Sequence, residues 1–296
     1  MRIPRLLEGL SRRRRLVCAG LVLSAVAALP ATAAAANVSA NWAGYVALPR
    51  SSKSFKSVSG SWTEPTLNCS AGRETYSAVW VGLGGYHASS RGLEQIGAEA
   101  DCSRNGQASY GTWYELIPAG PIALRLRTHP GDHMTASVTV IGQDATLRLR
   151  DMTAGTRYSV TRHVSSVDTS SAEWIIEAPS SCFTTSACQT LPLSDFGTVS
   201  FSSATATEGA QTAPADSPSW SDVGLELRQG SGVPTPAGGR RAGAESGASL
   251  IDATPSSLSG SQGAFTVHWR EEPLQAGEER PPGPSRGFGG DGTLRA

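Results

Sequence analysis

The chain has 296 residues, and its 25 Lys and Arg residues balance 25 Asp and Glu residues. Cleavage of the arginine-rich N-terminus would leave a mildly acidic protein, which removes the electrostatic basis for nucleic-acid binding. The roughly 260 residues that remain fit a single all-β sandwich or barrel domain.

The N-terminal segment is typical of a secretory signal peptide. Arginines within residues 2–15 precede an apolar run over residues 16–29, and small residues follow. The run is shorter than the roughly 20 residues that a membrane span needs. We therefore expect residues 1–36 to be removed by cleavage near Ala35 or Ala36, which gives a secreted, extracellular protein that is not held at a membrane.

Short segments that alternate between apolar and polar residues recur along the mature chain, separated by turn signals such as HPGD, GQD and TAGT. No stretch keeps a helical period. LRLR at residues 124–127 and again at 147–150 puts Leu on one face and Arg on the other, so these strands are predicted to have one solvated face. The pattern predicts an all-β fold, an antiparallel two-sheet β-sandwich of concanavalin or jelly-roll type. The segments are FKSVSGSWTEP, YSAVWVGLGG, LEQIGAEA, SYGTWYELIP, IALRLRTHPGDHMTASVTVI, ATLRLRDMTAGTRYSVTRHV, AEWIIEAP, FGTVSFSSATAT and GAFTVHWR.

Two later stretches lose this periodicity. Residues 228–247 are rich in Gly, Pro and Ala, and we expect a flexible excursion there, before a final strand over residues 264–269. Residues 271–296 are predicted to form a disordered tail. The single predicted domain therefore spans residues 37–270.

Cysteine usage agrees with export. Removal of Cys18 with the leader leaves Cys69, Cys102, Cys182 and Cys188, an even number that indicates two disulfides in a secreted protein. Four cysteines allow three connectivities. We favour Cys182 with Cys188 across a short loop and Cys69 with Cys102 around a hairpin.

Neither a metal nor a cofactor is expected. The sequence has no C-x-x-C pair, no G-x-S-x-G elbow and no phosphate-binding glycine loop. His129 and His133 are four residues apart, but HPGDH is a turn and lacks the helical face of a two-histidine zinc site. Carboxylates and amides remain as the candidate chemical groups.

The segment SAEWIIEAP places two acids within a predicted strand. Its Trp, two consecutive Ile and closing Pro favour an extended chain over a helix. With a period of two, Glu173, Ile175 and Glu177 share one face, while Trp174 and Ile176 point into the core. One face of the sheet is therefore predicted to carry paired carboxylates.

A series of motifs resembles the glutamic peptidase, or eqolisin, family, which includes scytalidoglutamic peptidase-like enzymes; the chain would be a secreted, bacterial-type member. Each motif alone is a weak signal, but they occur in the family's order, with good agreement over residues 39–201 and looser agreement to residue 269. The motifs are NWAGY, SGSWTEP, SAVWVGLGG, LEQIGAEA, TWYELIP, AEWIIEAP and DFGTVSF.

The resemblance implies a sandwich of two antiparallel sheets whose concave face holds a glutamine and glutamate dyad. The family's Leu-Gln-x-Gly matches Gln95, with Glu94 in place of the leucine, and the second acid of Ala-Glu-Trp-Ile-x-Glu matches Glu177. Glu177 would act as general base on water and Gln95 would stabilise the oxyanion, giving an endopeptidase that acts on polypeptides at acid pH. A monomer is expected.

Four further residues are supporting candidates. Trp113 and Glu115 match the family's Trp-Tyr-Glu, so they are expected to line the cleft and hold the dyad. Trp80 is either a cleft aromatic or an ordinary core residue. Glu173 lies on the same predicted face as Glu177, so the sequence leaves open an exchange of roles between these two acids.

This chain also departs from the fungal form of the pattern. Cleft acids and aromatics are replaced, which leaves the pH optimum open because neighbouring carboxylates tune the pKa of the base. NWAGY begins a few residues after the predicted cleavage site, so an inhibitory prosegment is expected to be absent or minimal. The departing residues are Gly84, Ile96, Glu99, Leu116 and Ala119.

Two other functional classes remain open. A glycoside hydrolase could use Glu115 and Glu177 as its carboxylate pair, with Gln95 dispensable. A non-catalytic module that binds glycan or peptide would depend on the aromatic residues rather than on the acids.

Overall fold

The computed structural model describes residues 37–50, 53–184, 187–231, 249–259 and 262–273. The predicted leader and most of the predicted tail lie outside these residues. The described residues all belong to one compact unit. No helix in the described ranges is both long and apolar enough to cross a membrane.

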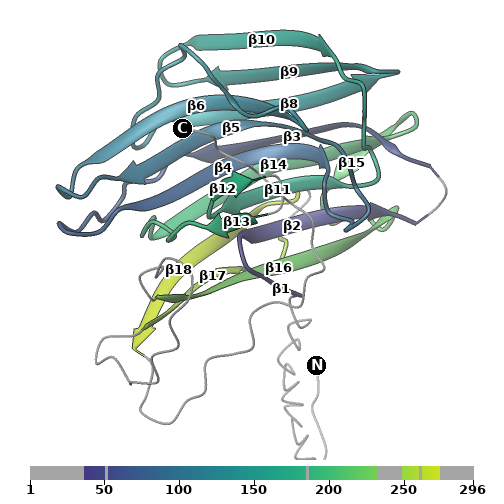
Figure 1. The fold of residues 1–296 in the computed structure, drawn as a ribbon. Helices are drawn as coiled ribbons and strands as arrows, with labels where there is room; N and C mark the ends of the chain where they lie inside the picture. The colour runs from purple at the N-terminus through teal and green to yellow at the C-terminus, as the bar shows by residue number, and fades with distance from the viewer. Residues whose placement is uncertain (1–36, 51–52, 185–186, 232–248, 260–261, 274–296) are drawn as a thin grey trace, which may run out of the picture. The chain divides into compact units, whose positions relative to one another are not determined.

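Every regular element in the described ranges is a strand, which confirms the all-β prediction (Figure 1). The strands are β1 Asn37–Ser39, β2 Trp42–Pro49, β3 Phe55–Thr63, β4 Thr75–Gly84, β5 Leu93–Cys102, β6 Ala108–Ile117, β7 Ile122–Ala123, β8 His133–Ile141, β9 Asp144–Asp151, β10 Thr156–His163, β11 Ala172–Glu177, β12 Ser180–Thr184, β13 Ala187–Thr190, β14 Thr198–Glu208, β15 Gln211–Pro214, β16 Trp220–Ser231, β17 Ser249–Pro255 and β18 Phe265–Pro273.

Most strands belong to one continuous hydrogen-bonded path that folds back on itself. Its order is β10-β9-β8-β3-β14-β18-β17-β16-β2-β11-β4-β5-β6-β7, with β1 and β15 as side branches and β12-β13 as a separate pair. Pairing along the path is antiparallel, and β1 alone pairs in parallel, with β16. Strands β4, β5 and β11 pack against β3, β8, β9 and β14, so the two halves of the path form the layers of the predicted β-sandwich.

The core between the layers follows the two-residue period of the strands. Trp174 and Ile176 of β11 are buried in this core, as predicted. Trp174 also donates a hydrogen bond from its indole nitrogen to the carbonyl oxygen of Ser59 in the other layer, at 2.7 Å. Gly60 makes room for the ring, because a Cβ there would lie 2.8 Å from Trp174 Cδ1. The two layers are therefore joined by both packing and a buried hydrogen bond.

A second apolar cluster lies on the opposite face of the layer that contains β11. Ile175 belongs to it, so adjacent residues of β11 pack on opposite sides of the sheet, as the sequence predicted. Its buried members are Trp42, Val46, Ala78, Trp80, Leu93, Trp113, Ile175 and Leu225.

The two LRLR segments turn out differently. Residues 147–150 form part of β9, with both Leu side chains buried and both Arg side chains exposed, as predicted. Residues 124–127 show the same alternation of burial but lie beyond the end of β7, so the predicted strand is wrong there. Alternation of apolar and polar residues indicates which side chains face the core, but it does not show whether the segment has a partner strand.

The C-terminal part is more ordered than expected at its boundaries. Strand β16 continues to Ser231 and pairs with β17, so residues 228–231 are strand, while the rest of the predicted excursion, 232–247, lies outside the described residues. Strand β18 reaches Pro273, past the predicted domain end at 270. Strands β16 and β17 match none of the segments predicted from the sequence.

One predicted disulfide is confirmed. Cys69 and Cys102 are bonded, with 5.4 Å between their Cα atoms. The backbone places Cys182 opposite Cys188 in the β12-β13 pair, and Cys188 is itself disulfide-bonded. The side chain of Cys182 lies outside the described residues, so the second pairing stays a prediction.

The Cys69–Cys102 bond closes a loop of 33 residues. Constraint of such a loop in the unfolded chain is worth about 3 to 4 kcal/mol. We expect the double change Cys69→Ser and Cys102→Ser to lower the free energy of unfolding by about that amount, measured by urea denaturation. Equal stability of parent and variant would contradict this expectation.

Candidate active site

The register of the sheet aligns three of the candidate side chains in one row. Glu173 on β11 lies opposite Gly82 on β4, Gly82 lies opposite Gln95 on β5, and Gln95 lies opposite Glu115 on β6. Glu177 lies four residues along β11 from Glu173, so the same two-residue period puts it on the same face. The structure therefore brings Gln95, Glu115, Glu173 and Glu177 to one face of one layer.

Glu177 receives two hydrogen bonds from side chains. Asn41 Nδ2 donates to Glu177 Oε1 at 3.3 Å, and Trp80 Nε1 donates to Glu177 Oε2 at 2.8 Å. The residue is only 3% exposed. Hydrogen bonds to a carboxylate favour its ionised form, so both neighbours help this acid to keep its charge although it is buried.

Gln95 is oriented by Glu115. Its amide nitrogen donates to Glu115 Oε2 at 2.7 Å, and the residue is fully buried. An amide nitrogen carries two hydrogens, so this bond leaves one N–H for another acceptor. Gln95 Oε1 is buried and has no hydrogen-bond partner among the described residues.

Glu115 connects the two candidate catalytic residues electrostatically. Burial and, to a smaller extent, the nearby charge of Glu177 raise the pKa of Glu115 to about 8, although the hydrogen bond from Gln95 acts to lower it. Glu115 is therefore protonated and neutral in acidic solution. Glu115 therefore interacts with both candidate residues: it accepts a hydrogen bond from Gln95, and its pKa is raised by the charge of Glu177.

Glu173 differs from Glu177 in its surroundings. It is fully buried, and burial raises its pKa well above the ordinary value; only the Ser171 hydroxyl acts to lower it. Asp168 and Glu94 add negative charge nearby, which raises the pKa further. Glu173 is therefore neutral in acidic solution, whereas two donors favour the ionised form of Glu177. This difference distinguishes two acids that the sequence alone leaves equivalent.

Two tryptophans build the wall around Glu177. Trp42 lies directly opposite Glu177 in the β2-β11 pair, and its ring meets that of Trp80 edge to face, with 5.0 Å between centroids. Gly97 allows this arrangement, because a Cβ there would lie 2.6 Å from Trp80 Cβ. Trp80 is thus both buried core and a hydrogen-bond donor to Glu177. The sequence left open whether Trp80 is a cleft aromatic or an ordinary core residue, and its role at a cleft stays a prediction.

Several polar atoms on this face are buried without a hydrogen-bond partner among the described residues. They are the indole nitrogens of Trp42 and Trp113, Gln95 Oε1, Glu115 Oε1 and both carboxyl oxygens of Glu173. Such atoms are rare in folded proteins and mark places where water or a ligand completes the hydrogen bonding. Trp113, predicted to line the cleft, therefore lies on the same face with an available donor.

The sequence analysis missed two of the residues that contact this site. Asn41 and Trp42 come from NWAGY, a motif that contributed to the family resemblance but was given no role. Glu94 was noted only as a departure from the family's leucine, yet it is fully buried, and burial together with the charge of Asp168 raises its pKa to about 8. The pairing of β2 with β11, and not a local pattern, brings Asn41 and Trp42 beside Glu177.

Asp168 is the ionised neighbour of Glu94 and Glu173. Burial acts to raise the pKa of Asp168, but hydrogen bonds from Ser170, Ser90 and the Gly85 amide lower it below the ordinary value. In the described ranges no group of three or more His, Cys, Asp or Glu residues is placed to hold a metal ion.

An all-β sandwich with a glutamine and a hydrogen-bonded glutamate on one face has the features that the resemblance to glutamic peptidases implied. Comparison with known proteins gives the family. A profile described as the Peptidase A4 family matches residues 40–226. Because the match covers more than half of the chain, this chain belongs to the Peptidase A4 family, the glutamic peptidases.

The individual relatives agree with this assignment. Aspergillopepsin-2 from Aspergillus niger is 27% identical over 199 residues, which is 59% of this chain and 66% of that protein. Scytalido-glutamic peptidase bound to a peptide-based transition state analogue has a TM-score of 0.58 at 19% identity, over 78% of this chain and 98% of that one. SCP-B, an eqolisin solved with the tripeptide Ala-Ile-His, has a TM-score of 0.54 at 19% identity, with the same coverages. At these identities the solved structures establish the shared fold.

The raised pKa of Glu94 predicts a change in stability with pH. Below pH 4 the carboxyl is protonated in both the folded and unfolded chain, so it has no effect; between about pH 4 and 8 only the unfolded chain ionises, and the folded state loses stability. We expect Glu94→Gln to raise the melting temperature at pH 7 by several degrees and to leave it nearly unchanged at pH 4. The exposed Glu272→Gln serves as the matched control, and an equal gain at both pH values would contradict the expectation.

Proposed function

We propose that this chain is a secreted, acid-active endopeptidase in which Glu177 is the general base and Gln95 stabilises the oxyanion. The observation that supports this best is the pair of hydrogen bonds from Asn41 and Trp80 to Glu177, on the sheet face that also carries Gln95. The enzyme would act as a monomer outside the cell, on polypeptide substrates.

In the proposed mechanism, ionised Glu177 removes a proton from a water molecule as the water attacks the scissile carbonyl carbon. The carboxyl then returns this proton to the leaving amine as the carbon–nitrogen bond breaks. The first step requires an ionised carboxyl, a condition that Glu177 satisfies better than Glu173 because of its two donors.

Gln95 would donate its remaining N–H to the oxyanion that develops on the carbonyl oxygen. Such a donor is worth about 2.7 to 4 kcal/mol when it is held in place before the reaction begins. The 2.7 Å hydrogen bond to Glu115 supplies that positioning. A neutral amide also avoids placing a second charge beside the base.

Acid activity follows from the charges on this face. At acid pH Glu115 and Glu173 are neutral, since burial raises the pKa of both, and Glu177 carries the negative charge that the chemistry needs. As the pH approaches the raised pKa of Glu115, a second negative charge appears beside the base and opposes the developing oxyanion. Activity is then expected to fall on the alkaline side.

The related structures support a peptide as the ligand of this face. One was solved with a peptide-based transition state analogue and another with the tripeptide Ala-Ile-His. In this chain the unpaired indole N–H groups of Trp42 and Trp113 are suited to the carbonyl oxygens of a peptide backbone.

Separate changes to the dyad test the proposal. We expect Glu177→Gln to reduce kcat by about 10²- to 10⁴-fold and Gln95→Ala by about 10²- to 10³-fold, on an unfolded protein substrate at pH 3 to 6. Pepstatin, which targets aspartic dyads, should not inhibit the parent. Glu173→Gln replaces a neutral carboxyl by a neutral amide and should keep most of the activity.

The same variants distinguish the other functional classes. Full activity of Glu177→Gln with loss in Glu173→Gln would overturn the assignment of the base. Hydrolysis of a glycoside that survives Gln95→Ala but not Glu177→Gln would favour the glycosidase, and absence of proteolysis by the parent across this pH range would remove the peptidase.

Glu115 is expected to act as a positioning residue rather than a catalytic one. Glu115→Gln keeps an oxygen that can accept the Gln95 N–H but cannot ionise, so it should retain activity at pH 4 and extend activity to higher pH. Glu115→Ala loses the acceptor and should reduce kcat by about 10- to 100-fold with little change in KM. Identical pH profiles for the parent and Glu115→Gln would contradict the role of this carboxyl in the alkaline decline.

A further inference from the structure

A groove lies between the two free edges of the folded sheet. Within the described ranges, β10 and β7 are the ends of the hydrogen-bonded path, so each has one edge without a partner strand. A groove of about 740 Å³ lies between them. It is lined by residues 122–127, His129, Ala154 and residues 156–158. Tyr158 of β10 stacks on Tyr114 of β6, the neighbour of β7, with 6.1 Å between ring centroids.

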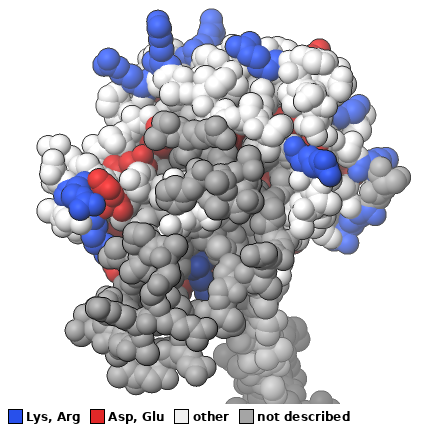
Figure 2. Space-filling view, in the orientation of Figure 1, with Lys and Arg blue, Asp and Glu red and all other residues white. Residues whose placement is uncertain are grey.

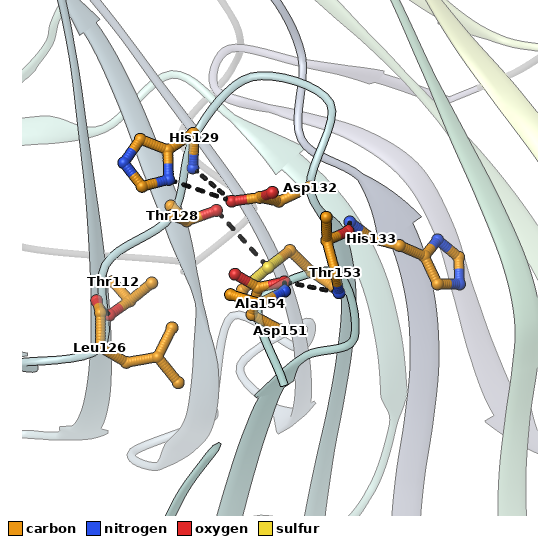
Figure 3. Close-up of polar contacts among 10 residues, drawn as sticks. Thr112, Leu126, Thr128, His129, Asp132, His133, Asp151, Thr153 and Ala154 are labelled. Carbon is orange, nitrogen blue, oxygen red and sulfur yellow. Dashed lines mark hydrogen bonds and ion pairs between the residues drawn. The ribbon is translucent and has the colours of Figure 1, made fainter. Parts of the chain in front are cut away.

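The first rim of the groove is held in place by backbone and side-chain hydrogen bonds. The Leu124 amide donates to the Thr112 carbonyl oxygen at 2.7 Å, and Thr112 Oγ1 donates to the Leu126 carbonyl oxygen at 2.6 Å. The His129 amide donates to Asp132 Oδ2 at 2.7 Å (Figure 3). The rim is thus fixed although residues 124–127 have no partner strand on their outer side.

The second rim is fixed by a buried acid. Asp151 Oδ1 accepts hydrogen bonds from the amides of Thr153, at 2.8 Å, and Ala154, at 2.9 Å, which closes the turn before β10 (Figure 3). The His133 amide in turn donates to Thr153 Oγ1 at 2.8 Å. Both rims are therefore shaped before any ligand arrives, which lowers the entropy cost of binding.

The groove combines an apolar floor with exposed positive charge. Leu124 and Leu126 turn towards the core, while the side chains of Arg125, Arg127 and Arg157 are exposed and form no ion pair with any described residue. No acidic residue lines the groove. Figure 2 shows basic side chains along the top of the view, where Figure 1 places β10, with few acidic ones among them.

We propose that this groove is an exosite that binds an acidic, extended segment of the polypeptide substrate, away from the scissile bond. The inference rests on the proposed endopeptidase function. Arginine pairs with carboxylates in a bidentate geometry, and an unpaired strand edge offers backbone donors and acceptors to an extended peptide. Both features recognise a polypeptide, and the backbone contacts at the edge have no counterpart for a sulfated polysaccharide.

The position of the groove relative to the candidate active site supports this role. The face with Glu177 on β11 and Gln95 on β5 continues across β6 to β7, where Ala123 lies opposite Trp113. Adjacent strands are about 4.8 Å apart, so a substrate that crosses β6 at Trp113 meets β7 one strand spacing further on. The remainder of the same chain can then enter the groove.

The experiment compares peptides that share one cleavable core and differ in a four-residue extension, either Asp/Glu or Asn/Gln, placed at each end in turn. At pH 5 we expect the acidic extension at one end to lower KM about 5- to 10-fold, with kcat unchanged, since each exposed carboxylate–arginine contact is worth less than about 1 kcal/mol. The preference should vanish at pH 3, where the substrate carboxyls are protonated, and weaken in high salt.

Variants assign the preference to the groove. Arg125→Gln combined with Arg157→Gln should abolish the preference while leaving cleavage of the neutral peptide unchanged. Arg148→Gln, an exposed change on β9 that does not line the groove, should leave the preference intact. Equal KM values for both peptides, or a preference that persists in the double variant, would overturn the exosite.

A binding measurement separates this inference from the proposed function. Fluorescence anisotropy of the labelled acidic and neutral peptides with the Glu177→Gln protein needs no cleavage, and 5- to 10-fold tighter binding of the acidic peptide at pH 5 is expected. Equal binding would reject the exosite even if the parent cleaves peptides. Groove-dependent binding of a sulfated polysaccharide without any preference for the acidic peptide would also overturn it.

Discussion

The proposed mechanism depends on a charged carboxylate at Glu177, on a sheet face where both Glu177 and Gln95 are buried. An ionised carboxyl in such a place is costly unless donors compensate it, and the indole of Trp80 and the amide of Asn41 supply them for Glu177. Burial raises the pKa of Glu115 and of Glu173 on the same face, which favours their protonated forms. The difference in hydrogen bonding thus favours a negative charge on Glu177 over one on its acidic neighbours.

This arrangement requires a close approach of β2 to β11, and glycine makes it available. Gly44 has a φ of +139°, and a Cβ there would lie 2.1 Å from the Trp174 carbonyl oxygen. Without that contact, β2 could not place Asn41 and Trp42 beside Glu177. Strand β11 therefore takes part in both contacts. Its Trp174 joins the two layers on the inner face, and its Glu177 accepts the hydrogen bonds on the other face.

Local features of the sequence were sufficient to predict many of the strands and the faces of β11, but not β16 or β17. Burial alternates every second residue, so Glu173 and Glu177 had to lie together once the segment was extended. Strand partners are a different matter. LRLR forms part of a strand at 147–150 but not at 124–127, and the bond from Asn41 to Glu177 joins residues 136 positions apart. Such pairings arise from the folded sheet, which no local pattern encodes.

Burial also separates the acids of this protein from those of an acidic substrate. Glu115 and Glu94 have pKa values raised to about 8, whereas an exposed carboxyl of a peptide titrates near 4. Between these values the buried acids are neutral, and an acidic peptide retains its own charge. An arginine side chain is not deprotonated in proteins, so its attraction to such a peptide persists. Between about pH 4 and pH 8, therefore, the buried acids beside the candidate base are neutral. In the same pH range a cationic groove can still distinguish an acidic peptide from a neutral one.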